Sequence, residues 1–483
     1  MEGVDHRGGG ERGTSGDAVI EDGYLLRQEP EDNGAGGYSS SSRKRRARDA
    51  VGRFGVRSFP WVILFFVLFV GFGVTFTYEA PAAVVSDLMT GMRMRNQDYA
   101  WLFTAYTIPN VVMPLAAGVI LDKLGIRFGV LLFIVLVAAG SYICAIAAYM
   151  DSFLVMVLGR FVIGLGGESS FVAADTVAFV WFSTGSWLSL SISFTAGAAR
   201  LGEIASFLSL PPISSEYGFQ FALLFTALVT SVSVFCVIVL VLLDNVAERR
   251  SNVFDMRLQR STDSLTLRSF FQLPVGVWLC ALTLVTYYGC IYPWIDFSSD
   301  WVQQQWGYSS DEAGRIVSFS GLTSIVVAPF LGFFLDRFGK KLWMINIGNV
   351  LLVTGCLLMT IPAVHPIFCV VIMGFAYATV ASALWPALSL IVDDDLFGTA
   401  YGLSMALANT CNLPIYQLLG YVLDNSRGID YGCYFLASVA GLGLLIGVVW
   451  QVVDRVWYHG ICDMTRAQRE RFLQKQALET PQT

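Results

Sequence analysis

Two copies of one short motif occur in this sequence, and each copy separates two long apolar runs. The first is Gly118-Val-Ile-Leu-Asp122-Lys123-Leu-Gly-Ile-Arg127, and the second is Gly332-Phe-Phe-Leu-Asp336-Arg337-Phe-Gly-Lys-Lys341. The two glycines and the two aspartates are each separated by the same 214 residues. A turn repeated in register indicates a duplicated half, and many secondary transporters are built from such halves. The motif therefore predicts a membrane transporter.

The composition favours a membrane protein over a soluble one. Of the 483 residues, 55% are hydrophobic and 14% are charged, which is too apolar for a soluble globular chain. The net charge of −6 does not indicate nucleic-acid binding. Nine cysteines form no C-x-x-C pair and only three histidines occur, so we predict no metal site, no cofactor and no enzymatic activity.

Twelve apolar runs are each long enough to cross about 30 Å of hydrocarbon as a helix. They predict an all-α membrane protein with twelve transmembrane helices in two six-helix bundles. The expected domains are a disordered cytosolic tail (1–55), an N-terminal bundle (56–244), a cytosolic linker (245–272), a C-terminal bundle (273–454) and a second cytosolic tail (455–483). The expected spans are 59–83, 98–121, 128–149, 153–179, 188–210, 219–243, 274–295, 311–335, 342–361, 366–391, 398–423 and 431–453.

Basic residues in the loops predict the orientation. The first tail contains five Lys and Arg residues between 43 and 48, and the central loop contains five Arg residues between 249 and 268. Because positive loops stay in the cytosol, both termini are predicted to be cytosolic. No charged-then-apolar pattern begins at Met1, so we expect no cleaved signal peptide.

The repeated turns suggest a conformational latch. Their glycines permit close helix contact, their aspartates can cap a neighbouring helix, and their basic residues can lie near helix C-termini. The alternative is a turn that charge merely keeps in the cytosol, which explains one copy but not two in register. The predicted latch residues are Gly118, Asp122, Lys123, Arg127, Gly332, Asp336 and Arg337.

Opposite charges lie within two neighbouring spans. Arg160 and Glu168 belong to span four, and Arg200 lies about 18 Å inside span five. An ionisable group at this depth is costly unless it is paired or hydrated, so it indicates function. Glu168 and Arg200 suit the ammonium and carboxylate of a small zwitterion. On the residues alone, a permanent Glu168–Arg200 ion pair that only locks the helices is equally favoured.

The repeated turn resembles the loop motif of the major facilitator superfamily, and the likeness covers all twelve spans. Further strings resemble a lysosomal, dipeptide-carrying branch of that superfamily. This resemblance implies a uniporter that releases dipeptides into the cytosol, with Glu168 and Arg200 holding the two peptide ends and Arg160 in a mostly structural role. The strings are Gly71-Phe-Gly73, Tyr78-Glu79-Ala-Pro81, Pro109-Asn110, Gly159 to Ser169, Ala199-Arg200-Leu-Gly202, Tyr287-Tyr288, Ala383-Leu-Trp385-Pro386 and Gly398-Thr-Ala-Tyr401-Gly402.

Three uncharged residue types at helical depth complete the candidate site. Tyr288 and Trp385 are predicted to line a pocket for the substrate side chains, although packing in the core or against lipid is favoured for any single aromatic residue. Asn409 is predicted to bond the peptide amide, and a role as interhelical glue is equally favoured. Tyr287, Tyr292, Trp294 and Tyr377 are weaker candidates of the same kind.

The chain departs from the resembling branch at Asp175, Glu203 and Asp296, where that branch has uncharged residues. Glu203 lies three residues from Arg200 and is close enough to pair with it on a helix. Because burial favours the protonated form of a carboxylate, Glu203 is also a candidate proton site. We therefore predict some pH dependence of transport.

The first tail contains a candidate sorting signal, in which Glu21 precedes Leu25 and Leu26 in the acidic dileucine pattern. Together with the resemblance, it predicts a lysosomal or other acidic endomembrane. The expected partners are dipeptides or similar zwitterions and the lipid bilayer, with no nucleic acid. The resemblance also implies a glycosylated single-span accessory protein. This chain itself has no Asn-x-Ser/Thr acceptor in a loop.

Three functions stay open at this point. The leading one is dipeptide transport. The first alternative is a proton-coupled carrier of other small organic anions, anchored by Arg200 with Glu203 as its proton site. The second is a nutrient sensor that does not transport, against which the intact central charges argue.

Overall fold

A computed structural model describes residues 59–182, 187–251, 273–392, 394–426, 428–465 and 468. The predicted first tail lies outside these residues, and so do the sorting residues Glu21, Leu25 and Leu26. The described parts of the chain are helical and contain no strand.

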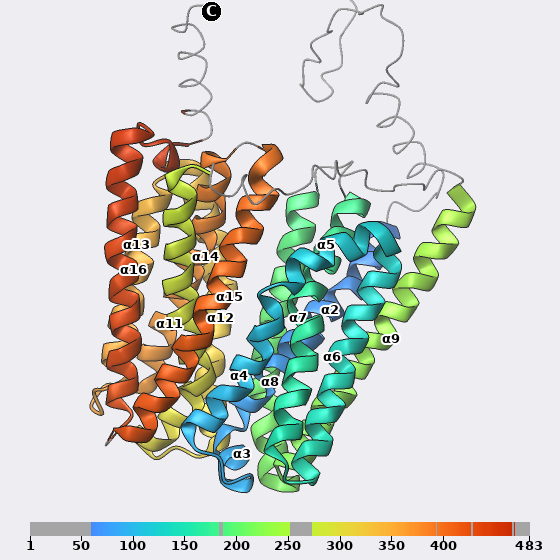
Figure 1. The fold of residues 1–483 in the computed structure, drawn as a ribbon, viewed down its shortest axis with the longest axis vertical. Coiled ribbons are helices and arrows are strands. Elements are labelled where there is room, and N and C mark those ends of the chain that lie inside the picture. Colours follow the sequence, from blue (N-terminus) through green and yellow to red (C-terminus); the bar gives the residue numbers. More distant parts are fainter. Residues whose placement is uncertain are drawn as a thin grey trace, which may run out of the picture. The chain divides into compact units, whose positions relative to one another are not determined.

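The described residues up to Ser251 form eight helices. Two of them make up one bent span, and one is short. Figure 1 shows them in blue to green. They are α2 (Phe59–Ala83), α3 (Val85–Gly91), α4 (Asn96–Asn110), α5 (Met113–Leu124), α6 (Ile126–Tyr149), α7 (Phe153–Phe182), α8 (Leu188–Tyr217) and α9 (Phe219–Ser251).

From Leu273 onward, the described residues form six long helices and a short 3₁₀ helix, coloured yellow to red in Figure 1. They are α11 (Val275–Trp306), α12 (Ser310–Phe338), α13 (Lys341–Leu358), α14 (Pro366–Ile391), α15 (Asp394–Asn425), α16 (Asp430–Trp457) and η1 (Ile461–Asp463). Below, "first half" means α2–α9 and "second half" means α11–η1.

The all-α membrane fold is confirmed, with a qualification on the number of spans. Within the described residues, nine helices are long and apolar enough to cross a membrane, or ten if the α4–α5 pair is one span. The remaining two long helices, α8 and α15, have 30 and 32 residues but are less apolar. Both pack against the opposite half, α8 on α12 and α15 on α4, so protein shields part of their polar surface from lipid.

The predicted span 98–121 is not one continuous helix. It is interrupted between Asn110 and Met113, and its two parts are bent by 42°. The cause is Pro114, which has no N–H to donate to the carbonyl of Asn110 four residues earlier. The prediction of an unbroken helix was therefore wrong at this point.

Several predicted boundaries also shift. Helix α9 runs on to Ser251, six residues past the predicted start of the linker at 245, and α11 runs on to Trp306 rather than ending near 295. Helix α16 likewise ends at Trp457, and η1 follows it inside the predicted second tail. The division at 245–272 stays a prediction, since residues 252–272 lie outside the described part of the chain.

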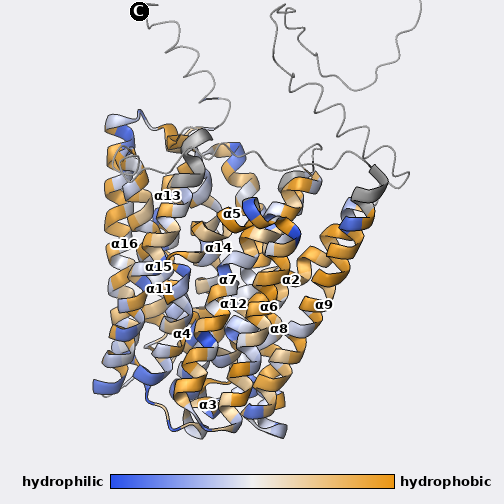
Figure 2. Ribbon diagram, turned by 45° about the vertical axis from the view of Figure 1, so that its right-hand side comes forward, coloured by the Kyte–Doolittle hydropathy of each residue, from blue (hydrophilic) through white to orange (hydrophobic). Residues whose placement is uncertain are grey.

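Glycines let several helices approach backbone to backbone. A Cβ added at Gly140 of α6 would meet the carbonyl oxygen of Gly159 on α7 at 2.7 Å. Between the halves, a Cβ at Gly314 of α12 would meet the carbonyl oxygen of Phe207 on α8 at 2.4 Å. Such small-residue contacts are the usual way in which membrane helices pack. Figure 2 shows hydrophobic residues along much of α2, α6 and α9, as expected for helices that cross a bilayer.

The two halves make their polar contacts mainly toward the end of the helices where α2 ends and α4 begins. We call this set the gate contacts. The carboxylate of Asp424 in α15 accepts the backbone N–H groups of Asn96 and Gln97 at 2.9 and 3.0 Å, which caps α4. The other members are Ser86–Gln303, Thr104–Gln417, Tyr78–Asp296 and Tyr99–Asp296.

Candidate functional site between the two halves

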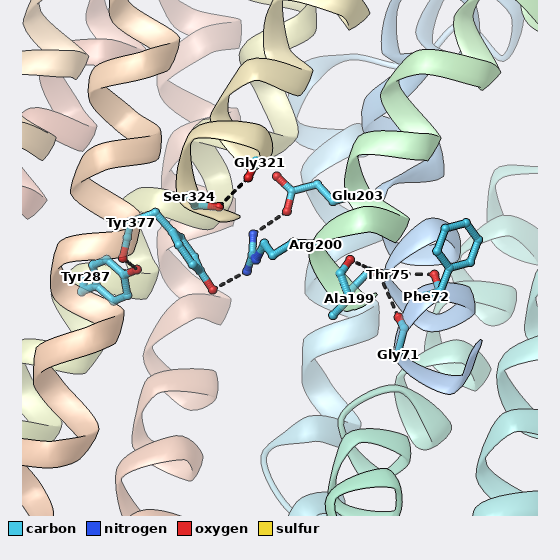
Figure 3. A network of polar contacts seen from close by, with 10 residues as sticks. All are labelled: Gly71, Phe72, Thr75, Ala199, Arg200, Glu203, Tyr287, Gly321, Ser324 and Tyr377. Atoms are coloured by element: carbon cyan, nitrogen blue, oxygen red, sulfur yellow. Dashed lines mark hydrogen bonds and ion pairs between the residues drawn. The ribbon is translucent and has the colours of Figure 1, made fainter. Parts of the chain in front are cut away.

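Arg200 of α8 lies at the centre of a polar cluster that joins the two halves. It forms a salt bridge with Glu203 one turn along the same helix, and it donates a hydrogen bond to the hydroxyl of Tyr377 on α14 (Figure 3). The Arg200 side chain is 20% exposed, whereas that of Glu203 is 4% exposed. Arg200 is therefore partly open to a ligand although it lies near the middle of a long helix.

Close packing of α2 and α8 positions Arg200. The hydroxyl of Thr75 in α2 donates to the carbonyl oxygen of Ala199 at 2.6 Å (Figure 3). A Cβ added at Gly202 would meet the carbonyl oxygen of Phe72 at 2.3 Å. The glycine thus allows the backbones to touch, and the residue between these contacts, Arg200, is directed toward α14.

Glu168 of α7 is half-buried and forms no hydrogen bond or ion pair with any described residue. The Glu168–Arg200 ion pair that the residues alone left open is absent from this part of the structure, because Arg200 bonds to Glu203 and Tyr377 instead. The carboxylate nevertheless has polar neighbours. It acts electrostatically on the hydroxyls of Tyr106, Tyr288, Tyr292, Tyr377 and Tyr401.

The charge of Arg200 also acts electrostatically on three of these tyrosines, Tyr288, Tyr292 and Tyr377. The Tyr288 ring stacks on Tyr292 with centroids 4.8 Å apart, and Tyr288 is 9% exposed. These rings of the second half lie within reach of both charges of the first half. The arrangement can offer an anion, a cation and aromatic faces to one small molecule.

Trp385 and Asn409 differ in their surroundings. Trp385 is half-buried and packs on the ring of Tyr401 at 4.3 Å, so it lies close to a tyrosine that Glu168 influences. Asn409 is 9% exposed, and its side-chain N–H donates to the carbonyl oxygen of Asn110 at 3.0 Å. This is the carbonyl that Pro114 leaves without a helical donor. In this conformation Asn409 therefore serves as interhelical glue rather than facing a ligand.

Arg160 is 1% exposed and bonds to backbone rather than to a carboxylate. Its guanidinium donates to the carbonyl oxygens of Leu102 at 3.2 Å and of Tyr78 at 3.0 Å. It thereby ties α7 to α4 and α2, a structural role in keeping with what the resemblance implied.

A second buried cluster was not selected from the sequence. Asp296 of α11 is fully buried, and its Oδ2 accepts hydrogen bonds from Tyr416 and, at 3.2 Å, from Tyr78. Glu79 of α2 is 4% exposed, and its Oε2 has no hydrogen-bond partner. Asp296 was noted only as a departure from the family pattern. The presence of an acid in an apolar run was the signal that could have identified Glu79.

The repeated turns differ from each other in their contacts. Arg127 forms a salt bridge with Asp244 near the end of α9, and Trp181 donates to the same carboxylate at 3.1 Å. A Cβ added at Gly118 or at Gly332 would have no heavy atom within 4 Å, so neither glycine marks a close helix contact in this conformation. Lys123, Asp336 and Arg337 are exposed, and the side chain of Asp122 lies outside the description.

The segment after α16 packs against the second repeated turn and is hydrogen-bonded to it. The side-chain carboxylate of Asp463 accepts a hydrogen bond from the backbone N–H of Leu342 at 2.9 Å. The backbone carbonyl oxygen of Asp463 accepts one from the backbone N–H of Lys340, also at 2.9 Å. Asp463 therefore caps the start of α13. Nothing in the repeated motif itself predicted this contact, because its partner lies 121 residues later in the chain.

Comparison with known proteins agrees with this architecture. The family model of the Major Facilitator Superfamily matches residues 62–300 and 279–461. The chain is 30% identical to the lysosomal dipeptide transporter MFSD1 of Mus musculus over 85% of this chain and 89% of that protein. It is 27% identical to the Homo sapiens protein of the same name, over 82% and 86%. The solved D-xylose–proton symporter has the same fold, with a TM-score of 0.62, 14% identity, and coverage of 81% of this chain and 96% of that one.

The matched regions include both halves and the two repeated turns. The chain is therefore a transporter rather than an enzyme, and it belongs to the major facilitator superfamily.

Proposed function

We propose that this transporter carries dipeptides across a lysosomal membrane, from the lumen to the cytosol, by alternating access. The observation that carries the proposal is the pair of central charges that do not satisfy each other. Glu168 has no partner among the described residues, and the Arg200 side chain is 20% exposed. Both charges act on Tyr288, Tyr292 and Tyr377. The ammonium of a zwitterion can supply the cation that Glu168 lacks, and its carboxylate can bind the exposed part of Arg200. The activity named for the relatives supports the same substrate class.

The position of the gate contacts supports a cycle with two states. They lie where α2 ends and α4 begins, which is the lumenal end if both termini are cytosolic as predicted. This conformation would then be closed to the lumen. In the opposite state the same contacts must break, and Arg200 must separate from Tyr377, because that hydrogen bond also joins the two halves.

A substrate carboxylate must compete with Glu203 for Arg200. If it displaces Glu203, that buried carboxylate loses its ion pair and becomes a site at which a proton can bind. Transport is then expected to depend on pH. The same observation supports the second candidate function, a proton-coupled carrier of small organic anions, which would need Arg200 and Glu203 but not Glu168.

Thermal shifts with blocked dipeptides distinguish the two functions, because a ligand that binds only the folded state raises the melting temperature. We expect alanyl-alanine to stabilise the purified protein, and its N-acetyl and C-amide derivatives to stabilise it much less. Glu168→Gln should abolish the difference between free and N-acetylated peptide. Arg200→Gln should abolish the difference between free and amidated peptide.

Asp175→Asn is the matched control, since Asp175 lies two turns from Glu168 on α7, is exposed and is bonded by Thr195. Its ligand profile should equal that of the parent. Stabilisation by monocarboxylates and by N-acetylated peptide alike would instead support the organic-anion carrier. Flux of labelled alanyl-alanine into proteoliposomes tests transport itself, and the absence of flux in a protein that binds the peptide would refute the proposal.

A further inference from the structure

The buried carboxylates of Glu79 and Asp296 have surroundings unlike those of any other acid in the site. Glu79 lies on α2 in the first half, and Asp296 lies on α11 in the second half. They are 4% and 0% exposed, and Oε2 of Glu79 and Oδ1 of Asp296 have no hydrogen-bond partner. A buried charged oxygen without a partner is costly. Binding of a cation or a proton would lower this cost.

Among the described residues, no cation forms an ion pair with either carboxylate. The guanidinium of Arg160, which acts electrostatically on both, donates to the carbonyl oxygens of Leu102, Thr77 and Tyr78 instead. The guanidinium of Arg200 is engaged by Glu203 and Tyr377. Since Glu203 already pairs with Arg200, Arg160 is the one described cation that acts on Glu79 and Asp296 without a carboxylate partner of its own. If both Glu79 and Asp296 are ionised, two negative charges face one positive charge. One bound proton removes that excess.

The charged and titratable groups around the pair come from six helices. Asp300, one turn from Asp296, adds a further buried carboxylate, although it is bonded by Gln304 at 2.7 Å. The groups that act on Glu79, on Asp296 or on the tyrosines bonded to Asp296 are Tyr78 of α2, Tyr99 of α4, Arg160 of α7, Arg200 and Glu203 of α8, Asp300 of α11 and Tyr416 of α15.

We propose that Glu79 and Asp296 form a proton-binding site between the two halves, and that the bound proton holds the gate contacts closed. The proton resides on Glu79, because the carboxylate of Asp296 already accepts hydrogen bonds from two tyrosine hydroxyls, whereas Glu79 accepts none from the described residues. Release of the proton leaves two negative charges across the interface, and their repulsion favours separation of the halves.

The site is placed to act on the gate directly. Tyr78 precedes Glu79 in α2 and bonds to both Asp296 and Tyr416 at 3.2 Å. Tyr99 of α4 donates to the carbonyl oxygen of Asp296 at 2.8 Å. Movement of α11 away from α2 therefore breaks the tyrosine bonds together, so the charge of the pair is linked to whether the gate is open. The inference rests on the proposed alternating access, but not on the identity of the substrate.

The test measures the gate itself, in the full-length protein and without any dipeptide. Spin labels at Thr90→Cys and Asn425→Cys, both exposed positions near the gate on opposite halves, report its width by double electron–electron resonance between pH 5 and pH 8. The native cysteines among the described residues are buried except Cys411, which is half-buried, so Cys411→Ser completes the background.

We expect the short-distance population to grow as the pH falls. For one linked proton, the ratio of closed to open populations changes by at most about tenfold per pH unit. Glu79→Gln and Asp296→Asn keep the side-chain size and remove one charge, so each should keep the gate closed across the whole range. Asp300→Asn should retain the response of the parent.

A distance distribution that does not depend on pH would overturn the inference. So would a response that persists in both Glu79→Gln and Asp296→Asn, or one that disappears in Asp300→Asn instead. None of these results depends on peptide binding. Failure here is thus distinguishable from failure of the proposed function, which the blocked dipeptides test separately.

Discussion

The guanidinium carbon of Arg200 lies 3.9 Å from the ring centroid of Tyr377, a residue 177 positions later in the chain. The same guanidinium donates a hydrogen bond to the Tyr377 hydroxyl. A cation over an aromatic face contributes about 0.5–2 kcal/mol. Tyr377 thus holds Arg200 in place from the opposite half, and Glu203 holds it from within α8.

Tyr377→Phe distinguishes the contribution of the Tyr377 hydroxyl from that of its ring. The variant keeps the cation–π contact and loses a hydrogen bond to a charged group, which is worth about 1.5–3 kcal/mol. We expect the affinity for alanyl-alanine to fall by about tenfold or more, because Arg200 is no longer oriented toward the substrate carboxylate. Titration of the purified variant by isothermal calorimetry measures the change.

The control is Tyr142→Phe, at an exposed position of α6. This substitution removes a hydroxyl that is hydrogen-bonded to Ser231 of α9. Its affinity should match that of the parent. An unchanged affinity in Tyr377→Phe would mean that Glu203 alone orients Arg200.

The helices of this chain could largely be predicted, because each apolar run has the length of one span. The predicted spans 59–83 and 366–391 coincide with α2 and α14. The bend near Asn110 was missed, since its cause is a single absent N–H at Pro114 rather than a change in hydrophobicity. The overrun of α11 was missed because the stretch from Asp296 to Asp300 is mostly polar yet buried by other helices.

The site could be predicted only in part, for a physical reason. A charge inside an apolar run is visible in the sequence, and so is a partner one turn away, as Glu203 is for Arg200. A partner in the other half is not visible. Tyr377 and Asp296 meet their partners across 177 and 218 residues, and only the packing of the halves determines which of many tyrosines and acids come together.

Gly202→Ala tests the contact that positions Arg200. The added Cβ would meet the carbonyl oxygen of Phe72 and the hydroxyl of Thr75, each at 2.3 Å. Since the first of these is backbone, α2 and α8 must move apart, and overpacking of this kind costs about 1–3 kcal/mol. We expect a lower thermal unfolding midpoint and weaker peptide binding.

Gly197→Ala, on the same helix, is the matched control for this substitution. An added Cβ there has no heavy atom within 4 Å, and alanine is favoured over glycine in a helix by about 0.8–1 kcal/mol. The midpoint should stay the same or rise. Equal midpoints for the two variants would show that the α2–α8 contact does not constrain the fold.

Asn409→Leu tests the bond across the break in α4–α5. It leaves the buried carbonyl of Asn110 without a donor, which costs about 1–3 kcal/mol. We expect a lower thermal midpoint and, in the spin-labelled protein, a larger open population. Thr410→Val, which removes an exposed hydroxyl bonded only within its own helix, should change neither.

The same bond can be examined by a double-mutant cycle. Pro114→Ala restores an N–H that can donate to the Asn110 carbonyl from within the helix. The effect of Asn409→Leu should therefore be smaller in the Pro114→Ala background than in the parent, with an interaction energy of about 0.5–3 kcal/mol. Strict additivity would rule out a shared carbonyl as the link between these residues.

Asp463→Ala tests whether the segment after α16 holds the second repeated turn. The substitution removes the cap that accepts the Leu342 N–H at 2.9 Å, at a cost of about 1 kcal/mol. The neighbouring Cys462 reports release of the segment. It is fully buried, and burial together with the carboxylate of Asp454 raises the pKa of its thiol, so it should resist maleimide in the parent at neutral pH.

Because about 1 kcal/mol corresponds to roughly a fivefold change in an equilibrium, Asp463→Ala should raise the labelling rate of Cys462 by about that factor. Mass spectrometry of the labelled peptide in a Cys411→Ser background gives the rate. Asp463→Asn keeps a side-chain oxygen that can accept the Leu342 N–H, so its rate should lie close to that of the parent. If Asp463→Ala and Asp463→Asn are labelled equally slowly, the cap does not hold the segment, and the bond between the Cys462 N–H and Asp454 at 3.2 Å is the contact that does.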